Sequence, residues 1–182
     1  MALASATPWF MQALAQVRAL RLPAWCIGAG AVRNLVWDAL HGHAVPSSLP
    51  DIDVAHFDAN DLSPARDAAL QRRLHALAPD TPWEVVNQAG VHLWYEREFG
   101  RAVEPLRSLD EGIASWPEFA TCVGLRLDDD DGLHVIAPHG LSDLFAMVVR
   151  HNPARVGVGA YRERIERKRF ARRWPRVTVI AA

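Results

Sequence analysis

In WCIGAGAVRNLVWDAL, residues 25–40, a short apolar run passes through a glycine turn into a helical pattern, and this change of pattern indicates the fold class. Residues 24–27 are apolar and short enough for a buried strand. Gly28 to Gly30 interrupt them as a turn, and apolar residues then recur at helical spacing from about Ala31 to Leu40. Such a strand–turn–helix unit brings backbone amides and a helix N-terminus close to any anion bound at the turn.

A second strand is predicted from Asp51 to Phe57, and it carries two carboxylates on one face. Side chains alternate along a strand, so Asp51 and Asp53 point the same way while Ile52 and Val54 enter the core. Two ionised carboxylates this close repel each other, and a bound divalent cation relieves the repulsion. Oxygen ligands that leave the coordination sphere open favour Mg²⁺, which keeps water and substrate phosphates as its other ligands. Taken alone, the pair fits a solvent-facing strand equally well.

A third acid, Glu84, lies between Trp83 and Val85 in a short strand predicted over residues 83–86. A carboxylate within an apolar strand is costly unless it faces a cleft, a metal ion or, on an edge strand, solvent. The ordered set of glycine turn, helix, paired acids and third acid is more specific than any one of its parts.

The rest of the chain alternates between helical and strand patterns. Helices are predicted from Thr7-Pro8, from Ser63-Pro64 with an apolar stripe at Leu70, Leu74 and Leu77, and over residues 109–115, 141–150 and 161–174. A hairpin joins residues 121–127 to 133–137 through a turn of four aspartates, 128–131, followed by Gly132.

These elements predict an α/β (α+β) fold, in which a mixed sheet is flanked by helices and a hairpin and further helices are added at the C-terminal end. We expect a single domain over residues 1–182, with its core at about 24–100 and a C-terminal elaboration at about 101–182.

Composition and net charge indicate whether a nucleic acid is an expected partner. Half of the 182 residues are hydrophobic and the net charge is −1, so the chain as a whole does not indicate a polyanion partner. Residues 161–176 nevertheless hold eight basic and two acidic side chains, a net charge of +6. We favour a solvated helix packed on the acidic remainder of the protein, with RNA or DNA binding through phosphates as the alternative.

Targeting signals are not evident. Cys26 and Cys122 lie in apolar runs and are expected to be buried thiols rather than a disulfide. No apolar run reaches the length of a membrane span, and no secretory signal precedes the first helix. We therefore expect a cytoplasmic protein without a membrane partner.

The order of the motifs resembles the polymerase-beta-like nucleotidyltransferase superfamily. Residues 27–34 look like its glycine motif and following helix, residues 51–54 like its paired metal ligands, and residues 83–85 like its third acid. Runs at 32–38, 87–89, 92–95, 137–141 and 143–145 are similar to a small family of bacterial nucleotidyltransferase-like proteins whose substrate is not established. This similarity extends over about residues 25–175.

The resemblance implies a magnesium-dependent enzyme that moves a nucleoside monophosphate from a nucleoside triphosphate to an acceptor. Asp51 and Asp53 would bind one or two Mg²⁺ ions, with Mn²⁺ as an alternative. Glu84 would complete the second metal site and help to activate an acceptor hydroxyl.

The resemblance also implies that the glycine motif binds the nucleotide. Backbone amides of Gly28, Ala29 and Gly30 would hold the phosphates, with help from Arg33. Many superfamily members have a serine where this chain has Ala29 or Gly30, so phosphate binding would rest on amides.

The acceptor is left open, as a small molecule, an RNA or a protein. Asn87, Gln88 and His92 follow the third acid and match the family pattern for the acceptor side of the cleft. They could instead satisfy backbone groups at a strand end and, for His92, pack on Trp94. A non-catalytic nucleotide- or nucleic-acid-binding module on the same fold is the alternative function, and a metal-dependent hydrolase is a third.

Overall fold

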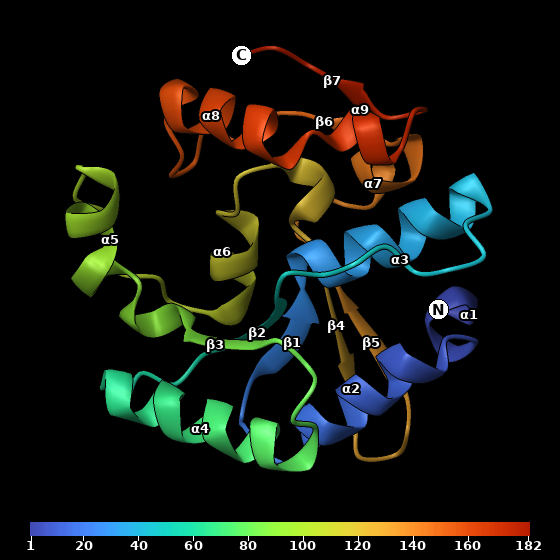
Figure 1. The fold of residues 1–182 in the computed structure, drawn as a ribbon. Coiled ribbons are helices and arrows are strands. Elements are labelled where there is room, and N and C mark those ends of the chain that lie inside the picture. The colour runs from blue at the N-terminus through green and yellow to red at the C-terminus, as the bar shows by residue number, and fades with distance from the viewer.

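Five strands form one mixed sheet in the order β3-β2-β1-β4-β5 (Figure 1). The computed structural model describes all 182 residues. The strands are β1 (Trp25–Gly28), β2 (Ile52–His56), β3 (Trp83–Asn87), β4 (Gly124–Leu127) and β5 (Leu133–Ile136). Strands β2 and β3 run parallel, and the other neighbouring pairs are antiparallel. The expected mixed sheet is confirmed, and the predicted hairpin adds its two strands to it.

The helices are distributed over the two faces of the sheet. They are α1 (Ala2–Ser5), α2 (Pro8–Arg18), α3 (Ala29–His41), α4 (Pro64–Leu77), α5 (His92–Phe99), α6 (Leu109–Ala114), α7 (Ser142–Ala146), α8 (Val158–Lys168) and α9 (Phe170–Arg173), with single 3-10 turns at Gln88–Gly90 and Phe119–Thr121. Helix α4 joins the parallel strands β2 and β3, since a parallel pair needs a long crossover. No helix combines the length and the apolar character needed to cross a bilayer.

One face of the sheet is closed by the main core and the other is only partly covered. Helices α2 and α4 lie below the sheet in Figure 1, where Ile52, Val54, Trp83 and Val85 are buried in the main hydrophobic cluster. Helix α6 covers part of the opposite face and contributes Ile113 to a smaller cluster. The alternation predicted from the sequence is therefore confirmed, and the uncovered part of this second face holds the acidic side chains.

The predicted helix over residues 141–150 is wrong. Helix α7 ends at Ala146, because Met147 adopts a left-handed backbone with φ of 56°. The next two residues form β6 (Val148–Val149), which pairs in parallel with β7 (Thr178–Val179). Carbonyls of Met147 and Val149 accept hydrogen bonds from the amides of Thr178 and Ile180, both at 2.9 Å. This long-range pairing overrides the local helical pattern.

Two smaller corrections concern helix ends. The helix predicted over residues 161–174 is split into α8 and α9 at Arg169, whose φ is 47°. Leu77 is 55% exposed, so the buried stripe of α4 consists of Leu70 and Leu74 alone.

The aspartate-rich segment is a hairpin turn, as predicted. Asp131 has a φ of 63°, which the Asp-Gly pair tolerates. Its carboxylate accepts a hydrogen bond from Arg18, while Arg126 binds Asp128. The turn is therefore held by arginines of α2 and β4.

Two glycines face each other where β1 and β4 pair, and they allow a close approach. Gly28 and Gly124 are register partners, and a Cβ on Gly124 would lie 2.4 Å from the Cys26 sulfur and 2.8 Å from its Cβ. We predict that Gly124→Ala lowers the free energy of unfolding by about 1–3 kcal/mol, because the sheet must shift to admit the methyl group. Urea denaturation measures the change.

A matched substitution serves as the control. A Cβ on Gly159, inside α8, would meet no atom within 4 Å. Gly159→Ala should therefore stabilise the protein, by up to about 1 kcal/mol, through helix propensity. Equal stabilities of the two variants would contradict the predicted clash at Gly124.

Candidate active site

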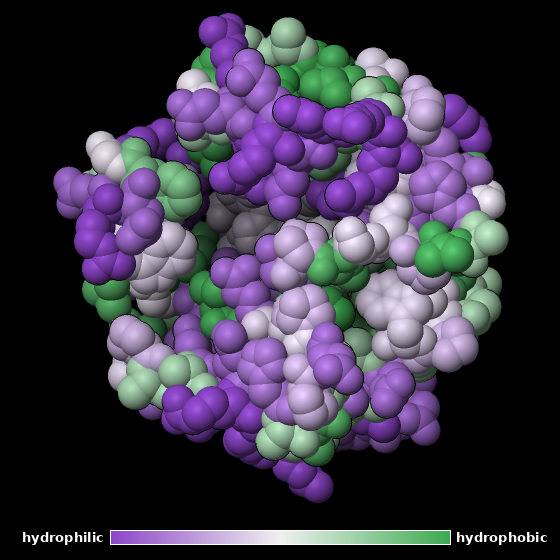
Figure 2. Space-filling model, in the orientation of Figure 1, coloured by the Kyte–Doolittle hydropathy of each residue, from purple (hydrophilic) through white to green (hydrophobic).

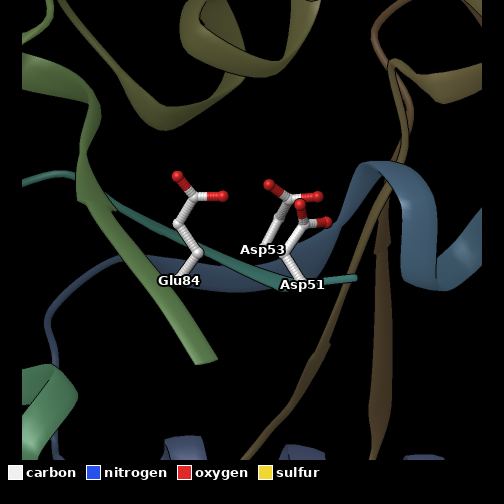
Figure 3. Close-up of side chains that lie close together, drawn as sticks. All are labelled: Asp51, Asp53 and Glu84. Atoms are coloured by element: carbon white, nitrogen blue, oxygen red, sulfur yellow. The ribbon is translucent and has the colours of Figure 1, made fainter. Parts of the chain in front are cut away.

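Three carboxylates converge on the open face of the sheet. Asp51 lies directly before β2, Asp53 lies within it, and Glu84 is the parallel register partner of Asp53 on β3. One carboxylate oxygen from each residue lies within 4.8 Å of the other two. Figure 3 shows the three side chains leaving the sheet on the same side and ending close together. The parallel pairing of β2 with β3 produces this convergence, because it aligns Glu84 with Asp53.

Burial and mutual repulsion make the cluster costly when it is fully ionised. Burial, together with the charges of Asp51 and Glu84, raises the pKa of Asp53 to about 6 against the opposing hydrogen bond from the Gly30 amide. Burial and Asp51 also raise the pKa of Glu84, which the Lys168 charge opposes. A divalent cation would remove this penalty, so the three oxygen donors fit a hard ion such as Mg²⁺.

The raised pKa of Asp53 predicts how stability depends on pH. The folded protein holds this proton more tightly than the unfolded chain, so stability contributed by the protonated form is lost as the pH rises from about 4 to about 6. In metal-free buffer, the free energy of unfolding should fall over this range. Asp53→Asn should flatten the curve and make the protein more stable at pH 8, by about 1–3 kcal/mol. Urea denaturation between pH 4.5 and pH 8 with a chelator measures both curves.

Magnesium provides the control for that prediction. At pH 8 the ion should stabilise the wild type by binding the folded state, and it should stabilise Asp53→Asn much less. Parallel pH curves for the two proteins would show that Asp53 does not carry the effect.

The glycine motif lies beside the acids, but its Ala29 and Gly30 amides already make hydrogen bonds within the protein. Helix α3 begins at Ala29, earlier than predicted, and Ala29 has a φ of 46°. The Ala29 amide donates to the Val123 carbonyl at 3.1 Å, and the Gly30 amide donates to Asp53. Ala29 and Gly30 line the cleft over the acids, whereas Gly28 does not. A Cβ on Gly28 would lie 2.5 Å from the Trp116 ring, so this glycine allows Trp116 to pack on the strand.

Arg33 lies within an aromatic cage. Its guanidinium carbon is 5.6, 5.1 and 5.3 Å from the ring centroids of Trp37, Phe170 and Trp174. One terminal nitrogen donates to Asn34 Oδ1 at 2.7 Å, and the buried Nε has no partner. Burial lowers the pKa of Arg33 to about 10, so the side chain stays charged at neutral pH. It lines the cleft from the α3 side.

The cleft itself has a volume of about 430 Å³, within the usual range for small-molecule sites. Its floor holds the three acids, one wall is α8 and one end is the aromatic side of α5. Figure 2 shows the hollow below the strongly hydrophilic surface of α8 and beside the mixed hydrophilic and hydrophobic surface of α5. The lining includes Trp94, Tyr95 and Phe99 from α5, Trp116 from the segment after α6, and Arg155, Ala160, Arg164, Arg167 and Lys168 from α8 and the residues before it.

The basic segment, residues 161–176, only partly matches the prediction of a solvated helix packed on the rest of the protein. Arg162, Arg173 and Arg176 bind backbone carbonyls of the protein itself, in keeping with a helix packed on its own chain. Arg164 and Lys168, by contrast, face the acids across the cleft. Sequence reasoning missed these cleft residues, although their spacing with Arg167 already puts them on one helix face.

Of the three residues expected on the acceptor side, only one lines the cleft. Asn87 is buried and accepts hydrogen bonds from the amides of Asp58 and Ala89, and it donates to the carbonyls of Asp58 and Asp61. It fixes a loop at the end of β3 and does not line the cleft. Gln88 does line the cleft, and His92 does not.

A second hollow, of about 630 Å³, lies away from the acids between the end of α2 and β4. Its Arg18 and Arg126 are already paired with aspartates of the hairpin turn. Its charged groups are thus largely satisfied by the protein, unlike those of the acidic cleft.

The chain is similar to known nucleotidyltransferases in sequence and in structure. A family model described as a nucleotidyltransferase matches residues 15–179. A search of curated proteins found no match. An NMR structure described as revealing a CCA-adding enzyme head domain superposes with a TM-score of 0.82 at 27% identity, covering 99% of this chain and 95% of that one.

Two larger structures share the fold at lower identity. The Thermotoga maritima CCA-adding enzyme complexed with tRNA matches with a TM-score of 0.54 at 14% identity over 95% of this chain. The apo form of a tRNA-processing enzyme matches with a TM-score of 0.53 at 17% identity over 93%. The match covers only 38% and 42% of those two chains, and at these identities it shows the fold alone.

Proposed function

Because this chain belongs to the nucleotidyltransferase family, whose model matches residues 15–179, we propose that it transfers a nucleoside monophosphate from a nucleoside triphosphate to an acceptor hydroxyl. The convergence of Asp51, Asp53 and Glu84 at the floor of a cleft is the observation that carries this proposal. The family membership supports the class of reaction, and the three carboxylates support a metal-dependent centre.

The three acids share two tasks in the proposed reaction. Asp51 and Asp53 hold one or two Mg²⁺ ions, which when bound would neutralise phosphate charge and lower the pKa of the acceptor hydroxyl. Desolvation and the Asp51 charge raise the pKa of Glu84, which suits a group that takes the hydroxyl proton. The acceptor oxygen attacks the α-phosphorus, and the bond to the bridging oxygen breaks. Pyrophosphate leaves with the electron pair of that bond.

The acceptor would enter on the side of Glu84 that faces α5. Gln88 and the rings of Trp94, Tyr95 and Phe99 line this side, so a planar group next to the hydroxyl could stack there. A solved protein with this fold is a CCA-adding enzyme complexed with tRNA. Transfer RNA is therefore the first acceptor to test, before small hydroxylic molecules and proteins.

The test measures binding and turnover separately. Titration calorimetry of the wild type with Mg²⁺ and each of the four common ribonucleoside triphosphates should show nucleotide binding that requires the metal. Incubation with tRNA should then release pyrophosphate and label the RNA. The absence of both metal and nucleotide binding would refute the proposal. Binding without pyrophosphate release would favour the non-catalytic module, and release of phosphate without an acceptor would favour a hydrolase.

A further inference from the structure

Acidic and basic side chains face each other across the cleft but form no ion pairs with one another. Asp51, Asp53 and Glu84 make no ion pair within 4.0 Å, and neither do Arg167 and Lys168. A ligand that is cationic toward the floor and anionic toward α8 would satisfy both sets.

The cationic set lies on one face of α8. Arg164, Arg167 and Lys168 stand at i, i+3 and i+4, with the small Ala160 one turn earlier on the same cleft wall. Like charges at this spacing repel each other along the helix face. Burial and the neighbouring arginines lower the pKa of Lys168, whereas the Asp51 charge raises it. A bound polyanion would attract all three cations and so offset their mutual repulsion.

Arg164 is held in place by a buried carboxylate. Glu118 is fully buried, accepts a hydrogen bond from the Thr121 hydroxyl at 2.9 Å, and pairs with Nε and Nη2 of Arg164. This two-point pairing fixes the plane of the guanidinium and leaves Nη1 for a ligand. Glu118 lies outside the cleft lining, so its role is to position Arg164.

Two amides of the glycine turn are already engaged within the protein. The Ala29 amide is bonded to Val123 and the Gly30 amide to Asp53, so neither is free for a phosphate. In contrast, the cleft-lining Arg33 has a buried Nε without any partner. The side-chain cations that line the cleft are therefore the charged donors it offers to an anion.

From these contacts we propose that the inner face of α8, formed by Arg164, Arg167 and Lys168, binds the polyphosphate of the nucleotide, with Glu118 positioning Arg164. The anion would be the β- and γ-phosphates, which leave as pyrophosphate. This inference rests on the proposed function, because it assigns the part of the substrate that meets α8.

Inorganic tripolyphosphate is the probe, since it has the phosphates without a base or sugar. The wild type should bind it by titration calorimetry in the presence of Mg²⁺. Arg164→Gln and Lys168→Gln should each weaken this binding by about 10-fold or more, the change expected for losing a charged hydrogen bond. Arg172→Gln removes the same charge from an exposed position of the same segment, and it should bind like the wild type.

Binding of Mg²⁺ alone separates this inference from the proposed function. Lys168 lies near Asp51 and Glu84, so Lys168→Gln should bind Mg²⁺ as well as the wild type or more tightly. If wild-type protein binds the nucleotide and releases pyrophosphate while Arg164→Gln and Lys168→Gln bind tripolyphosphate normally, this inference is wrong and the proposed function stands. If the wild type binds neither tripolyphosphate nor any nucleotide with Mg²⁺, both are wrong.

The role of Glu118 has its own test. Glu118→Gln keeps an acceptor for Thr121 but loses the charge that fixes Arg164, so tripolyphosphate binding should weaken about as much as in Arg164→Gln. In the Arg164→Gln background the same change should have no further effect on affinity. An additional loss there would show that Glu118 does not act through Arg164. Should Glu118→Gln fail to fold, the Arg164 and Lys168 variants still decide the proposal.

Discussion

Asp53→Asn is expected to reduce magnesium-dependent pyrophosphate release by about 1,000-fold or more. The carboxylate is central to the cluster, and its loss removes a ligand whose metal would provide several kcal/mol of charge stabilisation, where about 4 kcal/mol corresponds to 1,000-fold. Steady-state assays of pyrophosphate release at saturating Mg²⁺ measure the effect. Since the same change should stabilise the metal-free protein at pH 8, misfolding cannot account for the loss if the thermal transition is retained.

The control variant removes one negative charge at a position outside the cleft. Asp80 is exposed in the turn after α4 and makes no side-chain hydrogen bond or ion pair, so Asp80→Asn should retain full activity. Retention of more than a tenth of the wild-type rate by Asp53→Asn would mean that Asp53 is not a required metal ligand.

Trp174→Ala is expected to have the largest effect on stability, a loss of about 3–5 kcal/mol of unfolding free energy. Trp174 is 1% exposed and packs edge-on against Trp37, with 5.2 Å between the ring centroids. Its indole nitrogen donates to Asp38 at 2.7 Å, and its ring covers the Arg33 guanidinium. Truncation would open a cavity in the main core and unpack α9. Urea denaturation monitored by circular dichroism gives the cost.

Trp174→Phe separates packing from the hydrogen bond. The phenyl ring keeps most of the contact with Trp37, and Asp38 keeps the hydrogen bonds from the hydroxyl and amide of Ser47. The expected loss is therefore smaller, about 1–2 kcal/mol. Equal losses for the two variants would mean that the hydrogen bond to Asp38, rather than ring packing, fixes α9.

Local patterns were enough to predict the acidic floor. Alternation along β2 and β3 placed Ile52, Val54 and Trp83 in the core and Asp53 and Glu84 on the other face, as the structure confirms. Period-two geometry depends only on neighbouring residues, so it can be seen in the sequence. That the floor is a metal-binding centre stays a prediction until an ion is titrated.

Contacts between distant segments could not be predicted in the same way. The turn at Met147 follows from pairing with residues 178–180, and the cage around Arg33 is built by Phe170 and Trp174 from α9. Nothing near Arg33 in the sequence indicates that it is buried. Likewise, charge alone could not tell which side of the basic segment faces the acids, because this depends on where α8 docks.

The distance in sequence between the two sides of the cleft has a consequence for synthesis on the ribosome. Glu84 completes the acidic floor 80 residues before Arg164 is made, which at roughly 5–20 residues per second is a delay of about 4–16 s. Strand β4, the partner of β1 within the same sheet, is also translated during this interval. A nascent chain therefore has its mutually repelling acids well before the cations that face them. Magnesium in the surrounding solution would be the first counter-charge available to the growing chain.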